Sequence, residues 1–307
     1  MGKQTGKQRQ EGIYERVTGN VIELLERGVK PWTQPWAAGE GCDMPLRYNG
    51  QGYRGINVLI LWAEALDAGY TAPYWMTYRQ GQELGGQVRR GEHSVQVVYY
   101  GTAIKGEQQE SNGDGEDGRK VFRFLRTFNV FNAEQFDGLP ERYHAREVQR
   151  GPAAERRPQL DHFIHNTHAD IRHGGGRAFY RMPDDFIQVP DYAAFADAEK
   201  YYATVAHELT HWTRHPSRLN RDMGRKSWGD EGYAAEELVA ELGAAFLGAE
   251  LGLRPDHVED HAAYMAGWLK VLKNDRRFIF IAAAKAQEAA DYLLGRRVAA
   301  EKVAEAA

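Results

Sequence analysis

The segment His207-Glu208-Leu209-Thr210-His211 places two histidines four residues apart, with a glutamate directly after the first. It lies within a stretch, 198–214, whose apolar spacing predicts a helix. Residues four apart share one helix face, so both imidazoles can bind one ion while Glu208 projects beside them. This HExxH pattern is typical of a metal site in which the glutamate takes a proton from a coordinated water.

A site of this kind needs a third protein ligand, and the predicted helix 234–251 offers candidates. Glu237 and Glu241 lie four apart at one edge of its buried stripe, whereas Glu236 is expected to point to solvent. An unpaired buried carboxylate is costly, and a metal would supply the partner that Glu237 needs. Glu241 could then hydrogen-bond a ligand imidazole. The stripe itself consists of Leu238, Leu242, Ala245 and Ala249.

Other interpretations of these residues remain open. Without a metal, the two carboxylates would form salt bridges with a nearby arginine, Arg214 or Arg218. No Walker loop is present, and no Gly-x-Gly-x-x-Gly lies between a strand and a helix, so nucleoside triphosphate chemistry is not expected. The sequence does not decide between a structural and a catalytic role for His215, His257, His261, Tyr233 and Tyr264.

The elements that must position these residues are mixed helix and strand. In the first half, helices are expected at 13–27, 56–66 and 77–84, and strands at 94–100 and 121–130. Residues 101–120 between these strands are polar and read as a mobile hairpin insertion. In the second half we expect a helix at 160–172, strands at 178–182 and 186–189, and helices at 198–214, 234–251 and 262–290, the last breaking near Asn274-Asp275.

Composition bounds the class of protein. The chain has 307 residues, of which 42% are hydrophobic and 27% charged, as in a soluble globular protein of two domains. It has no apolar run long enough for a membrane span, and its single cysteine, Cys42, fits a reducing cytoplasm. The region 138–158 is rich in Pro, Gly and charge, so we expect domains at 1–145 and 159–307 joined by a linker at 146–158.

Aromatic, amide and arginine side chains alternate with glycines in the first half. Aromatic faces stack on unpaired bases and arginines neutralise phosphates, so these residues predict a local platform for single-stranded nucleic acid. The net charge of −4 gives no general support for such binding. The alternative is that the aromatic residues belong to the core. The candidates are Tyr48, Tyr53, Arg54, Asn57, Trp75, Arg79, Gln80, Arg89 and Arg90.

Three segments of the first half, YRGINVL at 53–59, WMTYRQ at 75–80 and GGQVRRGE at 85–92, resemble the N-terminal domain of ArdC-type antirestriction proteins. That domain also occurs at the front of conjugative plasmid primases. The second half, with HELTHW and EELVAELGAAFL, resembles the metallopeptidase domain joined to it. An HExxH helix followed by a second helix with ExxxE is similar to gluzincins, in which the third ligand would be Glu237 and the supporting carboxylate Glu241.

The resemblance implies an α+β single-stranded-DNA-binding domain followed by a mainly helical zincin-like metallopeptidase domain. It also implies a plasmid-borne cytoplasmic protein that binds zinc and shields incoming plasmid DNA from host restriction during conjugation. The expected partners are single-stranded DNA and, as peptidase substrate, a host restriction enzyme or another protein. The rival is a non-enzymatic DNA-binding protein that protects by occlusion and has a purely structural metal. A metallonuclease is disfavoured, since nucleases usually gather carboxylates around hard ions.

Overall fold

The computed structural model describes residues 6–32, 44–105, 120–144, 156–224, 231–253 and 261–295. The expected linker falls largely outside these ranges, as do Cys42, His257 and most of the hairpin insertion expected at 101–120. The fold is α+β, as the sequence predicts.

The first half combines helices with a small sheet. The sheet has four strands in the order β1-β2-β5-β4, in which β1 and β2 are parallel and the other pairs antiparallel. Strands β3 and β6 form a separate antiparallel pair. The elements are α1 (Gly6–Glu26), β1 (Leu46–Arg47), α2 (Ile56–Ala68), β2 (Tyr74–Met76), α3 (Tyr78–Glu83), β3 (Gln87–Val88), β4 (Val95–Lys105), β5 (Lys120–Asn132) and β6 (Phe136–Asp137).

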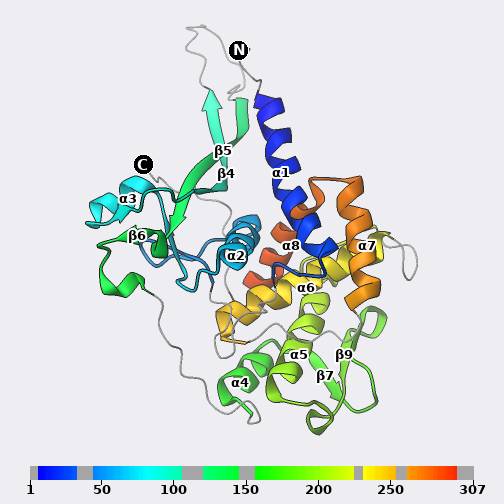
Figure 1. Ribbon diagram of the computed structural model, residues 1–307. Helices are drawn as coiled ribbons and strands as arrows, with labels where there is room; N and C mark the ends of the chain where they lie inside the picture. The colour runs from blue at the N-terminus through cyan, green and yellow to red at the C-terminus, as the bar shows by residue number, and fades with distance from the viewer. Residues whose placement is uncertain are drawn as a thin grey trace, which may run out of the picture.

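The hairpin β4–β5 is longer than expected. The two strands stay in register from Val95 opposite Val130 to Lys105 opposite Lys120, so they continue into the segment expected to be an insertion. Backbone pairing does not require apolar side chains, so the strands continue past the point where the apolar pattern ends. The sequence pattern therefore predicts the hairpin too short. In Figure 1 this hairpin and α1 extend toward the same end of the molecule.

The second half contains five helices and a small sheet among the described residues. Strand β9 lies between β7, which is parallel to it, and β8, which is antiparallel. The elements are α4 (Pro158–Asn166), β7 (Asp170–His173), β8 (Phe179–Arg181), β9 (Phe186–Val189), α5 (Ala198–Trp212), α6 (Glu231–Leu251), α7 (His261–Asn274) and α8 (Phe278–Leu293).

One prediction in this half is wrong. The helix expected at 160–172 ends at Asn166, and Asp170–His173 forms β7 against β9. His168 takes a positive φ of 57°, which turns the chain out of the helix. The pairing partner lies far along the sequence, so a local periodicity could not show it. The break near Asn274 occurs as expected, between α7 and α8.

Helix α6 lies at the centre of the molecule and packs against α5, α7 and α8 (Figure 1). The core is shared by both halves of the chain, because α1 also packs on α7, and α2 on α8. No helix in the described part of the chain combines the length and apolar character needed to cross a membrane. Within the described ranges, three aromatic pairs join the halves, with ring centroids 4.7 Å apart for Tyr14–Phe280, 5.7 Å for Trp32–Trp268 and 5.9 Å for Trp62–Phe246.

Candidate metal centre

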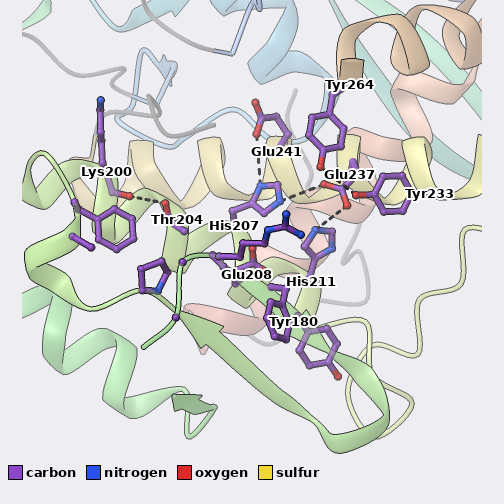
Figure 2. Close-up of a pocket in the computed structure, with 18 of the residues that line it drawn as sticks. Tyr180, Lys200, Thr204, His207, Glu208, His211, Tyr233, Glu237, Glu241 and Tyr264 are labelled. Carbon is purple, nitrogen blue, oxygen red and sulfur yellow. Dashed lines mark hydrogen bonds and ion pairs between the residues drawn. The ribbon is translucent and has the colours of Figure 1, made fainter. Parts of the chain in front are cut away.

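Helices α5 and α6 bring three candidate ligands together. His207 and His211 lie one turn apart on α5, and Glu237 faces them from α6 (Figure 2). The Nε2 atoms of His207 and His211 each lie 3.5 Å from a carboxylate oxygen of Glu237. One ligand atom from each residue can be chosen so that all lie within 4.8 Å of one another.

The close approach of the two helices depends on a missing side chain. A Cβ atom on Gly243 of α6 would lie 2.5 Å from Cγ2 of Thr210, which stands inside the HExxH segment of α5. Such a contact is shorter than van der Waals separation, so any larger residue would push the helices apart. Gly243 therefore helps to hold Glu237 within reach of both imidazoles.

The donor set fits a divalent metal ion. Two imidazoles and one carboxylate are the ligands of many catalytic zinc sites, in which a fourth position stays open. Burial disfavours the charged forms, yet Glu237 raises the pKa of both His207 and His211, and the imidazoles hold the pKa of Glu237 well below its usual range. A divalent cation can therefore bind between these three side chains in place of the protons on the imidazoles.

Each ligand imidazole also meets a second carboxylate through Nδ1. Glu241 Oε2 lies 3.6 Å from His207 Nδ1, and Glu241 Oε1 lies 2.5 Å from the Nζ atom of Lys30. Glu241 thus lies beside His207, the residue type that the sequence analysis expects it to support. Lys30 belongs to the first half of the chain, and no sequence pattern indicated that it would reach this site.

The expectation that Glu236 points to solvent is wrong. It is only 2% exposed, and its Oε1 lies 3.2 Å from His211 Nδ1. Arg221, itself buried, donates to both carboxylate oxygens at 2.7 and 2.9 Å. Burial opposes its charged form, but His211 and Arg221 together lower the pKa of Glu236. Helix α6 is apolar on nearly all faces, a pattern that could have indicated burial of all three glutamates.

Glu208 lies beside the cluster without belonging to it. Its side chain is buried, and burial raises the pKa of its carboxyl group. The imidazoles of His207 and His211, and to a smaller extent the backbone of Tyr180 in β8, act on this pKa in the opposite direction. A raised pKa suits a group that accepts and returns a proton near neutral pH.

The three candidate ligands, Glu208 and Glu241 line one cleft of about 870 Å³. Tyr233 and Tyr264 project into it beside Glu237, with their hydroxyl oxygens 3.2 Å apart (Figure 2). Burial raises the pKa of Tyr233, so its hydroxyl keeps its proton. His215 does not line this cleft and contacts Ser217 through Nδ1. The cleft also holds three basic side chains, Arg177, Lys200 and Arg214.

The expected nucleic-acid platform is only partly present on the surface. Tyr53 and Trp75 are 7% and 2% exposed, so they belong to the core and offer no stacking face. Asn57 bonds to the backbone of Val98, and Gln80 completes the capping box of α3, so both amides have structural roles. Aromatic composition cannot distinguish a core ring from a surface ring, which is why this part of the prediction was wrong.

The remaining candidates lie at the surface. Arg54 is half-exposed and forms an ion pair with Asp291 of α8. Arg89 pairs with Glu92 at 2.8 Å. The other exposed candidates are Tyr48, Arg79 and Arg90.

Metal binding should stabilise the fold. The candidate ligands come from two helices, so only the folded chain brings them together. Added Zn²⁺ at about one hundred times its dissociation constant should therefore raise the free energy of unfolding by about 2.7 kcal/mol. Thermal unfolding with and without a chelator checks this, and His211→Ala should remove the difference.

Since protons compete for imidazoles whose pKa is raised, metal affinity should increase with pH. An affinity that falls with pH would contradict this ligand set.

Comparison with known proteins gives matches to both halves. Residues 11–131 match the N-terminal domain of anti-restriction factor ArdC, and residues 158–285 match a zincin-like metallopeptidase domain. The chain is 40% identical to the uncharacterized protein y4eC of Sinorhizobium fredii (strain NBRC 101917 / NGR234) over 94% of each protein. It is 42% identical to a DNA primase TraC of Escherichia coli, and this match covers 92% of the chain but 27% of the primase.

Solved structures extend the likeness to the whole fold. Metal-free antirestriction ArdC from the R388 plasmid is 46% identical, with a TM-score of 0.79 over 92% of this chain and 97% of that one. The Mn(II)-bound structure of the same protein gives 44% and 0.77, over 94% and 99%. Since sequence and fold agree over nearly the full length of both proteins, the chain belongs to the ArdC family of antirestriction proteins.

Proposed function

We propose that this protein is a plasmid-borne antirestriction protein that binds single-stranded DNA and contains a metal-dependent peptidase site. The enzymatic part rests on one observation, the convergence of His207, His211 and Glu237 beside Glu208 in a single cleft. The antirestriction part rests on the R388 relative, which is named for that activity. Its place of action would be the cytoplasm of a cell that receives plasmid DNA by conjugation.

The proposed mechanism assigns a task to each residue of the cleft. His207, His211 and Glu237 would hold a divalent ion, for which we propose zinc, and that ion supplies Lewis acidity and an acidified water. Glu208 accepts the proton of the attacking water and returns it to the leaving amine. The hydroxyl groups of Tyr233 and Tyr264 lie where they can donate to an oxyanion.

A peptide is the substrate that the cleft suits best. Residues 177–180 line it, and among the described residues β8 pairs only with β9, so its second edge is open. An extended peptide can add to such an edge through backbone hydrogen bonds. The donor set also favours zinc-type hydrolysis over a nuclease site built from carboxylates.

The direct test is to incubate the zinc-loaded protein with a mixed peptide library and to detect new termini by mass spectrometry. We expect cleavage that stops when a chelator is added. A parallel incubation with labelled single-stranded DNA tests the alternative that the protein is a metallonuclease. Cut DNA with intact peptides would overturn the proposed peptidase activity.

Single-strand binding should depend on exposed arginines rather than on the buried aromatics. The side chain of Arg79 is 88% exposed, and Arg90 is exposed too. Reversing both charges, R79E with R90E, should weaken DNA binding and reduce the slope of log affinity against log salt by about 0.7 for each lost phosphate contact.

Fluorescence anisotropy with a labelled oligonucleotide at several salt concentrations measures both quantities. The matched control is R277E, which reverses an arginine of the second half that is 67% exposed. Full-length variants are preferable to truncated chains, because the two halves share a core. An equal loss in R277E would contradict the assignment to the first half.

A further inference from the structure

A short segment of the first half reaches the metal centre. Lys30 follows α1 and extends its Nζ atom to within 2.5 Å of Glu241 Oε1, and the two side chains are 8% and 2% exposed. Two residues later, Trp32 packs edge-on against Trp268, which lines the cleft. Residues 30–32 therefore form part of the structure that surrounds the candidate ligands, although they belong to the other half of the chain.

The ion pair continues directly to a candidate ligand. Glu241 directs its second oxygen toward His207 Nδ1 at 3.6 Å, while His207 Nε2 lies 3.5 Å from Glu237 (Figure 2). An anion beside Nδ1 favours the tautomer with the proton on that nitrogen, which leaves the Nε2 lone pair for an ion. The orientation of His207 thus depends on where the Glu241 carboxylate is held.

His211 has the same arrangement within the second half alone. Its Nδ1 faces Glu236, whose carboxylate is held by Arg221 through two hydrogen bonds. Both imidazoles therefore meet a buried carboxylate that is paired with a buried cation. The difference is the origin of the cation, because Arg221 is local to the metal centre and Lys30 is not.

We propose that Lys30 is a positioning residue of the metal centre, so that the first half of the chain completes the site on the second. By pairing with Glu241, Lys30 fixes the carboxylate that orients His207. A buried carboxylate that loses its cation is strongly disfavoured and tends to change its position or its partners. The proposal rests on the proposed metal-binding role of His207, His211 and Glu237.

The test uses the full-length protein and measures zinc affinity by competition with a chromogenic chelator. Lys30→Met keeps the length of the side chain and removes its charge, and it should weaken zinc binding by about 10- to 100-fold. The visible absorption of the Co²⁺-substituted protein should change as well, since it reports ligand geometry. The matched control is Lys273→Met, the same substitution in another ion pair between the halves, with Glu26, and it should bind zinc like the wild type.

A double variant shows whether Lys30 acts through Glu241. In a Glu241→Gln background, Lys30→Met should have no further effect on zinc affinity. An equal effect in both backgrounds, or a Lys30→Met affinity within twofold of Lys273→Met, would overturn the proposal. If Lys30→Met does not fold, Lys30→Gln replaces it with the same expected loss. A wild-type affinity no better than that of His211→Ala would instead overturn the metal site itself, and this proposal with it.

Discussion

Replacing Glu208 with glutamine should reduce peptide hydrolysis by about 10²- to 10⁴-fold while the bound metal is retained. The amide keeps the size of the carboxylate but cannot accept the proton of the attacking water. Glu208 is not among the three clustered ligands, so metal content should not change. The measurement is kcat/KM for a peptide identified from the library, together with elemental analysis of the purified variant.

The same variant separates the two readings of antirestriction. Glu231→Gln is the matched control, because this glutamate of α6 is 56% exposed. Loss of protection in recipient cells with Glu208→Gln alone would make hydrolysis part of antirestriction, whereas full protection would favour occlusion of the DNA. Undiminished hydrolysis by a metal-loaded Glu208→Gln protein would exclude Glu208 as the proton acceptor.

Arg221→Met should lower the free energy of unfolding by about 3–5 kcal/mol. The guanidinium donates to both oxygens of Glu236, to the carbonyl oxygen of Thr210 and to the hydroxyl of Thr213, all in the protein interior. Methionine fills much of the same volume but leaves the Glu236 carboxylate buried without its cation. Denaturant unfolding monitored by circular dichroism gives the change.

Two further variants make this prediction specific to burial. Arg79→Met removes an ion pair with Glu83 whose partners are 88% and 61% exposed, and it should cost no more than about 0.5 kcal/mol. Adding Glu236→Gln to Arg221→Met removes the stranded charge and should recover part of the stability. A double variant less stable than Arg221→Met would show that the buried charge is not the cause.

The proximity of His207, His211 and Glu237 could be predicted because its geometry is mostly local. Two histidines at i and i+4 fix one face of α5, and Glu237 on the next helix, α6, supplies the carboxylate that faces both Nε2 atoms. The helices of the second half were also well predicted where their apolar spacing was long and regular. Gly243 is different, because its importance appears only when Thr210 lies opposite it.

What failed depends on contacts between distant parts of the chain. Residues 170–172 belong to the expected helix but form part of β7, which pairs with β9. Tyr53 and Trp75 are residue types typical of a binding surface but lie in the core. Glu236 is wrongly expected in solvent when one buried stripe of α6 is considered alone, because the helix is apolar on nearly all faces. No sequence pattern indicates that Lys30 lies at the site, since its partner Glu241 is 211 residues away along the chain.

The shared core has a consequence for how this protein is inherited. Because Tyr14, Trp32 and Trp62 pack against rings of the second half, a gene carrying either segment alone would encode a protein with an exposed apolar face. Recombination would then move the two segments as one cassette. The TraC primases match 92% of this chain within proteins of several times its length, as expected if the two segments stay joined wherever they occur.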